Sequence, residues 1–542
     1  MHQRSGGQSG DHVVALVTGV HRFVPAFVEL LRRRRGCPGH AGQRLFIAVA
    51  GILLCVGLAS CAVGPDYHAP EPPVPSSFVP SSANRAGRAA ETAKWWRTLH
   101  DRQLDSLIER ATADNPSVEV ALDRLQQARA QELVILGIAL PQVDASAGGG
   151  WGTGSDLARG RASQALVSAE TGTGFGQVVN MGGFDAAWQI DVFGKYRRAL
   201  EAAQYDTEAA VAARNVVLIA VISDVTRAYL DLRALQMQLI VLQKNIRVAQ
   251  KYLDFVQERY NRGITNELDV TLAQRELAQL QSQIAPLIAQ IDAARYVIAV
   301  LIGEFPENLG SELKQPKMLP ALPTSIGSGL PIDLLRRRPD VVEAERALAS
   351  ATAQIGVATA DLFPQVAAVA SVGRQTSLTP LTVSTIWSAG PAFNAPVLDF
   401  GRLDAIVEKA DYRSRELLAN YKQVVLNAVR EVDSSVAAYS AQQDRLRHLT
   451  EALTAARRAV DLATERFERG LTDSLNVIDA QRQEFLIEEQ YIVAQQNAAD
   501  QLVTLYRSLG GGWEDYQILP PIRKPLPAVA AAFRSLLAPN GE

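Results

Sequence analysis

The sequence predicts a mainly α-helical fold with a small β component, and three observations lead to this fold class. Two runs of 68 residues, 195–262 and 402–469, contain neither proline nor glycine, so each can form one long helix. An eighteen-residue phrase occurs twice, as ERYNRGITNELDVTLAQR at 258–275 and as ERFERGLTDSLNVIDAQR at 465–482. Short segments rich in Val, Ala, Gly and aromatic residues precede each long run and are typical of strands.

Each long run ends in an Arg-Gly dipeptide that predicts a turn between two helices. Apolar or small side chains recur before it at alternating spacings of three and four, which indicates a coiled-coil seam. The pattern resumes after the dipeptide as far as Ile302 in one copy and Leu509 in the other, with Pro286 as a kink or break. Because glycine supplies the left-handed conformation that ends a helix, the repeated phrase predicts the turn of a helical hairpin, present twice. The seam residues are Leu218, Val221, Val225, Ala228, Leu232, Leu235, Leu239, Leu242, Ile246, Ala249, Leu253, Val256 and Tyr260 in the first copy, and Val425, Ala428, Val432, Tyr439, Leu446, Leu449, Leu453, Ala456, Val460, Ala463 and Phe467 in the second, where Ser435 and Gln442 interrupt them.

The strand-like segments have the length of membrane strands. They cover residues 141–152, 178–193, 364–376 and 385–400, two in each copy. Their alternation is only partial, so soluble hairpins that cap a helical bundle are the alternative interpretation. Four strands cannot close a barrel, and an open sheet edge is not tolerated in lipid, so several chains must contribute to one barrel.

The N-terminus predicts a processed lipoprotein. An apolar stretch from Leu45 to Leu58 follows a basic segment and is too short for a comfortable transmembrane helix. Leu58-Ala59-Ser60-Cys61 resembles a bacterial lipobox, after which Cys61 would become the lipid-modified first residue. An ordinary secretory signal with an incidental cysteine is the alternative. Ala62 stands where an inner-membrane retention signal usually has Asp, which favours sorting to the outer membrane.

Internal repetition gives the domain organisation. Matching residues are 207 positions apart from Gly194 and Gly401 onward, and 223 positions apart upstream, where Pro116 matches Pro339. The first copy therefore carries 16 additional residues in between. The predicted divisions are an N-terminal extension and signal peptide (1–60), a lipid-anchored segment (61–100), a first repeat (101–303), a linker (304–331), a second repeat (332–512) and a C-terminal tail (513–542).

Composition and motifs exclude several classes of function. The 542-residue chain is 47% hydrophobic with a net charge of −3, which argues against disorder and against a nucleic-acid surface. After the predicted cleavage only His68, His100 and His448 remain, far apart in sequence, so we expect no metal site. Gly194-Lys195 is followed by Tyr196 rather than Ser or Thr, so no P-loop is present. We expect no enzyme, no catalytic residue and no cofactor.

The chain resembles the TolC-like outer-membrane efflux proteins, most closely the lipoprotein subgroup named after NodT. The resemblance covers Cys61 to about Trp513 and implies trimers with a 12-stranded outer-membrane barrel and a periplasmic barrel of long helices. The matching residues are Cys61-Ala-Val-Gly-Pro-Asp-Tyr67, Trp95-Trp96, Asp114-Asn115-Pro116, Pro141-Gln142, Trp188-Gln-Ile-Asp-Val-Phe-Gly194, Leu398-Asp-Phe-Gly401, Glu465-Arg-Phe-x-x-Gly470 and Leu509-Gly-Gly-Gly-Trp513.

The resemblance also implies a gate at the mouth formed by the hairpin turns. Asp479 lies nine residues after Gly470, too deep in its helix to be an N-cap. In the family an Asp at this position points into the constriction, where three carboxylates would repel one another and attract cations. The family often has a further acid three residues earlier, where this chain has Asn476. Asp269 is the candidate in the first copy, but it follows Asn266 by three residues, so a capping role is equally consistent with the sequence.

The two turns resemble the surface that engages a periplasmic adaptor, and solvated loops are the alternative. The candidate docking residues are Arg262, Gly263 and Asn266 in the first turn, and Arg469, Gly470 and Asp473 in the second.

The implied function is passive export. The chain would be the outer-membrane channel of a tripartite, proton-driven efflux system for small toxic compounds or drugs, with an adaptor and an inner-membrane pump as partners. Two alternatives stay open: the same channel serving polypeptide secretion or metal export, and a coiled-coil lipoprotein that tethers envelope layers.

Overall fold

The structure is a computed structural model that describes residues 62–70, 93–152, 177–323, 337–378 and 381–516. The described residues belong to one compact unit. Cys61, the end of the predicted linker and the predicted tail beyond 516 lie outside the described residues.

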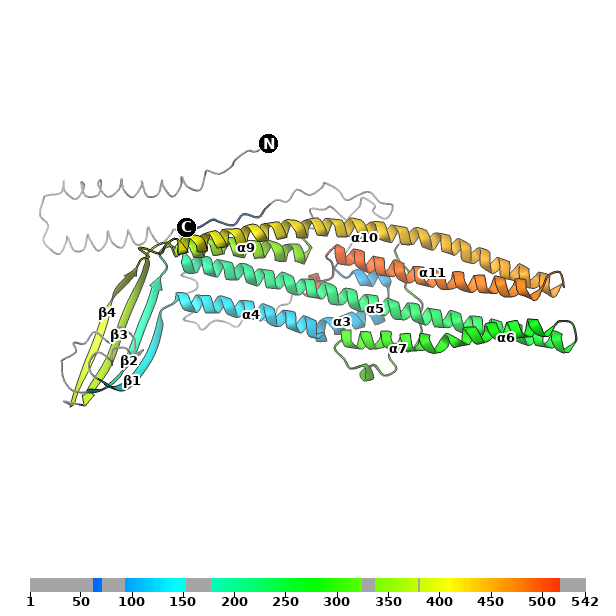
Figure 1. Cartoon of the computed structure of the whole chain (residues 1–542), viewed down its shortest axis with the longest axis horizontal. Coiled ribbons are helices and arrows are strands. Elements are labelled where there is room, and N and C mark those ends of the chain that lie inside the picture. The colour runs from blue at the N-terminus through cyan, green and yellow to red at the C-terminus, as the bar shows by residue number, and fades with distance from the viewer. Residues whose placement is uncertain (1–61, 71–92, 153–176, 324–336, 379–380, 517–542) are drawn as a thin grey trace, which may run out of the picture. The chain divides into compact units, whose positions relative to one another are not determined.

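The two copies have the same order of elements, two strands between a short and a long helix (Figure 1). Both long helices contain 67 residues and are about 100 Å long at 1.5 Å per residue. The first copy contains α3 (Arg102–Asp114), α4 (Pro116–Ala139), β1 (Gln142–Gly152), β2 (Gln177–Ile190), α5 (Lys195–Asn261), α6 (Glu267–Ser282) and α7 (Ile284–Leu301). The second contains α9 (Pro339–Ala360), β3 (Gln365–Leu378), β4 (Leu381–Asn394), α10 (Arg402–Glu468) and α11 (Ser474–Ser508). Short 3-10 helices are η1 (Trp95–Leu99), η3 (Pro306–Leu309) and η4 (Glu514–Tyr516).

The predicted hairpin turns are confirmed at both Arg-Gly dipeptides. Gly263 and Gly470 each have a φ of 72°, in the left-handed region that favours glycine. The amide of Gly263 donates to the carbonyl of Tyr260, and the amide of Ile264 donates to that of Arg259. The same two hydrogen bonds recur 207 residues later, so both turns are Schellman motifs.

The returning helix of the first copy is broken, as Pro286 predicts. Because proline lacks an amide hydrogen, the regular helical ladder fails one turn before it, and α6 ends at Ser282. Pro286 also lines a cavity of about 300 Å³ with Leu242 of α5 and Phe485 of α11. The second copy has no proline here, and α11 runs unbroken for 35 residues.

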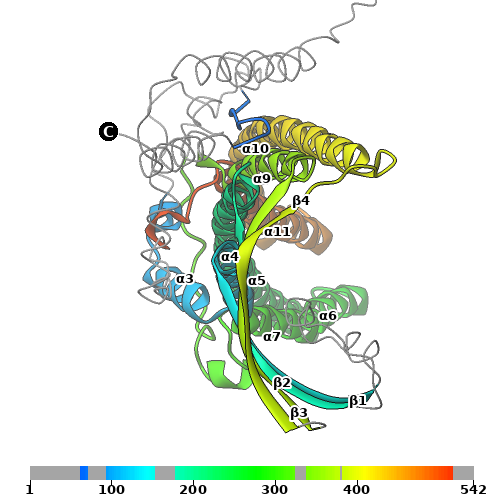
Figure 2. The ribbon, with the colours of Figure 1, turned by 90° about the vertical axis from the view of Figure 1, so that its left-hand side faces the viewer.

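The four strands form one antiparallel sheet in the order β1-β2-β3-β4, seen from its end of the helices in Figure 2. The predicted bounds of β4 were wrong: the strand covers 381–394 rather than 385–400. Pairing with β3 fixes its position, since Leu381 lies opposite Leu378 and Asn394 lies opposite Gln365. The residues beyond, 395–401, form the turn that leads into α10, where the Asp399 carboxylate accepts hydrogen bonds from the amides of Gly401 and Leu403.

The main apolar core lies part-way along the helices and joins both copies. Trp95 of η1 stacks on Tyr506 of α11 with ring centroids 4.8 Å apart, and both rings are buried. Apolar residues of α3, α5, α7, α10 and α11 surround this pair. The core therefore holds the two hairpins together far from both the sheet and the turns.

Candidate functional site

The sheet has one polar face and one apolar face. Asp144 lies directly opposite Asp185, which lies opposite Ser371, which lies opposite Ser388, so all four share a face. Ser146 on this face donates to Asp185 at 3.0 Å. The opposite face carries exposed apolar side chains, including Phe184, Trp188, Ile190, Val372, Trp387 and Phe393. The alternation that was partial in the sequence is clearer once the strands are paired, although exposed Arg374 shares the face of Val372 and exposed Val369 that of Ser371. The sheet fits lipid on one side and water on the other.

The sheet ends in two edges, β1 and β4, that pair with no other strand in the described residues. A lone four-stranded sheet would leave both rows of backbone groups unpaired in lipid, at a cost of several kcal/mol for each group. This arrangement requires strands from other chains.

The predicted docking residues lie on two exposed turns with matching chemistry. Arg262 forms an ion pair with Glu258, and Arg469 forms the equivalent ion pair with Glu465. Large apolar side chains are also exposed at equivalent positions of both turns; these are Ile264 and Leu268 in the first, and Leu471 and Leu475 in the second. Each turn therefore presents an apolar pair beside an arginine.

Asp479 and Asn476, the gate candidates of the second copy, are both exposed on α11. They are three residues apart and therefore neighbours on the same helix face. The described residues leave both side chains exposed.

Asp269, the gate candidate of the first copy, lies in a local capping arrangement. The Asn266 side chain accepts a hydrogen bond of 3.1 Å from the backbone amide of Asp269, and the Asp269 carboxylate accepts a hydrogen bond from the Thr265 hydroxyl. The side chain is half-buried. Asp269 thus has partners within its own turn, and the second copy has Asn476 at the equivalent position.

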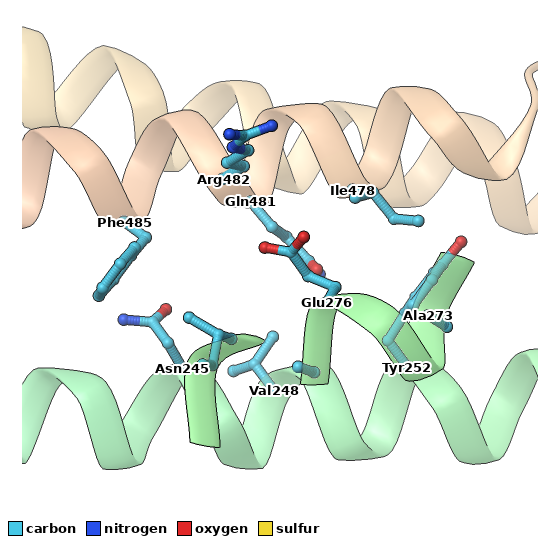
Figure 3. A pocket seen from close by; sticks show the side chains of 11 residues that line it. Asn245, Val248, Tyr252, Ala273, Glu276, Ile478, Gln481, Arg482 and Phe485 are labelled. Carbon is cyan, nitrogen blue, oxygen red and sulfur yellow. The ribbon is translucent and has the colours of Figure 1, made fainter. Parts of the chain in front are cut away.

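On the side of the turns that faces the sheet, the two hairpins meet along α5 and α11 (Figure 3). Phe485 and Ile478 of α11 point toward Val248 and Tyr252 of α5 around a cavity of about 30 Å³. Side chains of both hairpins line this small pocket, so the hairpins of one chain are in contact here.

An ion-pair network crosses the same junction. Glu488 of α11 is buried and lies 3.3 Å from Lys244 of α5 and 3.0 Å from Arg457 of α10. Glu484, one turn earlier, lies within 3.8 Å of the same two cations. Because the carboxylates are shielded from solvent, these contacts are stronger than those of exposed pairs.

A second polar contact between α5 and α11 lies farther from the turns. Gln496 donates to Asp231 at 2.7 Å, and Arg227 lies 3.9 Å from Asp500, whose side chain is 27% exposed. Burial raises the pKa of the Asp500 carboxyl to about 6; the negative charge of Asp231 adds to this rise and Arg227 opposes it.

The geometry described so far, a two-faced membrane sheet on long helical hairpins, agrees with the comparison to known families. The model of the family described as "Outer membrane efflux protein" matches residues 107–304 and 330–511. The chain belongs to this family.

Individual relatives and solved structures agree with this assignment. Nodulation protein T of Rhizobium leguminosarum bv. viciae is 29% identical over 87% of this chain and 95% of its own length. The cation efflux system protein CusC of Escherichia coli (strain K12) is 28% identical over 84% of this chain and 98% of its own length. The solved structure of the outer-membrane channel OprN is 32% identical, with a TM-score of 0.74 over 84% of this chain and 100% of that one. The fold class predicted from the sequence, mainly α with a membrane β-barrel, is confirmed.

In this efflux protein, the segment that follows Cys61 is bound at the start of α5. The Val63 amide donates to Phe193, and the Arg198 guanidinium binds the Val63 carbonyl at 3.2 Å and the Asp66 carboxylate at 2.6 Å. Gly64 lies so close to Gly356 of α9 that a Cβ on it would be 2.4 Å from the Gly356 Cα. Residue 62 is thereby held where β2 ends and the helices begin.

Sequence reasoning missed the contacts between the hairpins. Glu484 and Glu488 are four residues apart on α11, which in the sequence is typical of an exposed helix face. Their partners Lys244 and Arg457 lie on other helices, and the one available signal, two acids at helical spacing beside a seam, does not identify those partners.

Proposed function

We propose that three copies of this chain form an outer-membrane channel that passively conducts small toxic compounds in a tripartite, proton-driven efflux system. The observation that carries the proposal is the two-faced sheet with two open edges. Three such sheets joined at β1 and β4 make a 12-stranded barrel, with the Asp185 face toward the pore and the Trp387 face toward lipid.

Exposed apolar side chains on the helices support the association of copies. On α7 they include Tyr296, Val297 and Val300, and on α10 they include Tyr412 and Leu426. In a single copy these side chains would be exposed to water, at a free-energy cost of about 25 cal/mol for each Å² of apolar surface. Neighbouring copies that pack α7 and α10 against one another remove this cost and extend the barrel through the periplasm.

The six hairpin turns of a trimer would ring the periplasmic mouth. We assign the gate to Asp479 and Asn476, because both are exposed on one face of α11. Asp269 is a weaker candidate, because Thr265 and Asn266 already engage it. Three Asp479 carboxylates would repel one another while they attract cations to the mouth.

The turns themselves suit an adaptor that presents apolar and acidic groups. Gly263 and Gly470 shape both turns, Arg262 and Arg469 offer cations, and Leu268 and Leu475 offer apolar contact area. Asn266 and Asp473 begin the returning helices at the same surface. Since no P-loop is present in the sequence, the energy for export must come from an inner-membrane pump behind the adaptor.

Lipid attachment at Cys61 completes the proposal. Arg198, Gly356 and Phe193 hold residues 62–66 at the junction of sheet and helices, the level at which the periplasmic face of the membrane would lie. A lipid on the preceding residue would enter the adjacent leaflet without stretching the chain. Mass spectrometry of the detergent-extracted protein should find acyl chains on Cys61, and Cys61→Ser should lack them.

Metal-ion export is the second candidate, because one relative is named a cation efflux system protein. A deletion strain complemented with this chain distinguishes the two: resistance to drugs and dyes supports the first, and resistance to metal cations alone supports the second. Loss of the resistance on addition of a proton uncoupler is expected for a proton-driven pump, and an uncoupler-insensitive export would exclude it.

Conductance in a planar bilayer tests both the channel and its gate. The purified full-length protein should form a cation-selective pore, and Asp479→Ala should raise its conductance and lower its selectivity. Asp461→Ala is the matched control, because this exposed acid lies nine residues before Gly470 as Asp479 lies nine after. An absence of pores contradicts the channel, whereas pores that Asp479→Ala leaves unchanged contradict only the gate.

A further inference from the structure

The junction between the two hairpins of one chain contains an aromatic contact just above the turns. Phe467 of α10 is only 8% exposed and packs against two rings of α5, with centroid distances of 5.9 Å to Phe255 and 6.3 Å to Tyr252. The Arg259 guanidinium lies 5.1 Å from the Phe467 ring, in the range of a cation–π contact. This contact joins the second hairpin to the first.

The internal repeat predicts where the same contact recurs between copies. In a closed ring of alternating hairpins, each second hairpin also adjoins the first hairpin of the next copy. Shifting the four residues by 207 positions gives their counterparts: Tyr260 for Phe467, Ala459 for Tyr252, Leu462 for Phe255 and Arg466 for Arg259.

The counterparts are exposed in the single chain, as an unfilled contact requires. The seam of α5 is buried or half-buried except at its last member, Tyr260, which is 40% exposed. Leu462 is 42% exposed on α10, much as its counterpart Phe255 is 39% exposed on α5, so the difference between the junctions lies at the inserted ring, where Tyr260 is exposed and Phe467 is buried. A ring is thus open beside an apolar surface, at a position that the repeat relates to a filled contact.

We propose that Tyr260 of one copy packs against Leu462 and Arg466 of the neighbouring copy, and that this junction between copies separates first when the mouth opens. The inference rests on the proposed function, since it requires a closed ring of copies. Beyond the proposed function, the inference names the residues that form the contact between copies. It also states that the junction between copies separates before the junction within a chain.

Residue types at the two junctions explain the order. Phe467 meets two aromatic rings within its chain, whereas Tyr260 meets Ala459 and Leu462 of the neighbouring copy, which offer less apolar area. The junction between copies is therefore the less filled of the two.

The ion-pair network also indicates that the junction between copies separates before the junction within a chain. Glu488 has Gln281 as its counterpart, Glu484 has Leu277, and Arg457 has Gln250. Lys244 itself has Glu451 as its counterpart. The shifted set therefore contains one acid and no cation, so the junction between copies cannot repeat the buried ion pairs of the junction within a chain.

Cysteine cross-linking tests the proposal on the full-length trimer, whose mature chain has Cys61 as its sole native cysteine. Tyr260→Cys with Leu462→Cys, treated with a short bis-methanethiosulfonate reagent, should give covalent dimers and trimers on a denaturing gel. In a planar bilayer, the link should also abolish the transitions from the conductance of the closed mouth to the larger conductance of the open mouth, and a reducing agent should restore these transitions. Either single-cysteine variant alone should remain monomeric on the gel.

The matched control links the hairpins within one chain. Phe255→Cys with Phe467→Cys should cross-link without forming covalent oligomers, and the transitions should persist. The proposal is overturned if the first pair stays unlinked in an intact non-covalent trimer, if its link leaves the transitions unchanged, or if the control link blocks them. A protein that forms neither trimers nor pores overturns instead the proposed function on which the inference rests.

Discussion

The two hairpins of this chain share their length and their turns but not their contacts. Each consists of a 67-residue helix, a Schellman turn and a returning helix. In the second hairpin, Phe467 and Glu488 are buried against the first, whereas the equivalent Tyr260 is exposed and position 281 is a glutamine. The repeat therefore preserves the backbone, while side-chain substitutions distinguish the junction within a chain from the junction between chains. Each of the following predictions tests one side-chain difference between the copies.

The largest expected effect comes from the aromatic contact. Phe467→Ala removes a buried ring from between Tyr252 and Phe255 and should destabilise the closed turn region by about 3 kcal/mol. Tyr260→Ala should cost about 1 kcal/mol, because its surroundings hold less apolar area. Hydrogen–deuterium exchange of peptides covering 463–480 and 256–273 in the purified protein measures both losses. Equal increases in exchange for the two variants would contradict the assigned difference.

The Asp500 carboxyl should make the junction of α5 and α11 depend on pH. Its pKa is raised to about 6, so the folded state disfavours the charged form; stabilisation is complete below the usual value near 3.8 and is lost as the pH rises through 6. Asp500→Asn should therefore be more stable than the parent by up to about 3 kcal/mol at pH 7.5, given about 1.4 kcal/mol per pKa unit, and nearly equal to it at pH 4.

Thermal unfolding across this pH range measures the difference. The first copy has Ala293 at the equivalent position, so the effect belongs to the second copy alone. Asp224→Asn is the control, because Asp224 is 47% exposed beside the same Arg227. A difference between Asp500→Asn and the parent that stays constant from pH 4 to 7.5 would exclude Asp500 as the titrating group.

The backbone of both hairpins was predictable because its determinants are local. Gly263 and Gly470 end their helices through their own left-handed backbone conformation. Pro286 breaks a helix because it lacks an amide hydrogen, which does not depend on the surrounding helices. The bounds of β4 were less predictable, because pairing with β3 rather than composition sets its ends. The two faces of the sheet likewise became apparent only from the register, which places Asp185 opposite Asp144 and Ser371.

The candidate site was predictable only in part for the same physical reason. Asn266 and Asp269 are three residues apart, so their capping contact was among the alternatives that the sequence offered. Phe467 and Tyr260 have equivalent positions and similar side chains, and the sequence gives no sign that only one is buried. Their difference depends on residues of another helix, which no local pattern specifies.

Glu488→Gln gives the second copy the residue that the first carries at position 281. The change leaves Lys244 and Arg457 with the Glu484 carboxylate, 3.8 and 3.7 Å away, as a remaining counter-charge, and both cations are about half exposed and can be rehydrated. We therefore expect a loss of about 1 kcal/mol, measured by thermal unfolding at pH 7.5. Lys244→Met combined with Glu488→Gln should cost less than the sum of the two changes; additive costs would show that the pair is not coupled.

The smallest expected effect distinguishes the two turns at the start of the returning helices. The Asn266 side chain accepts the amide of Asp269, so Asn266→Ala should cost about 1 kcal/mol of local stability. Asp473 occupies the same position in the second copy, but among the described residues its side chain makes no capping hydrogen bond. Asp473→Ala should therefore cost only a few tenths of a kcal/mol, about the loss of a carboxylate near the positive end of the α11 dipole. Raised salt should diminish the Asp473 effect and leave the Asn266 effect unchanged, because screening weakens a charge–dipole interaction more than a neutral hydrogen bond. Hydrogen exchange of the first turns of α6 and α11 at two salt concentrations measures both effects, and an equal salt response would contradict the assignment of different roles to these two equivalent residues.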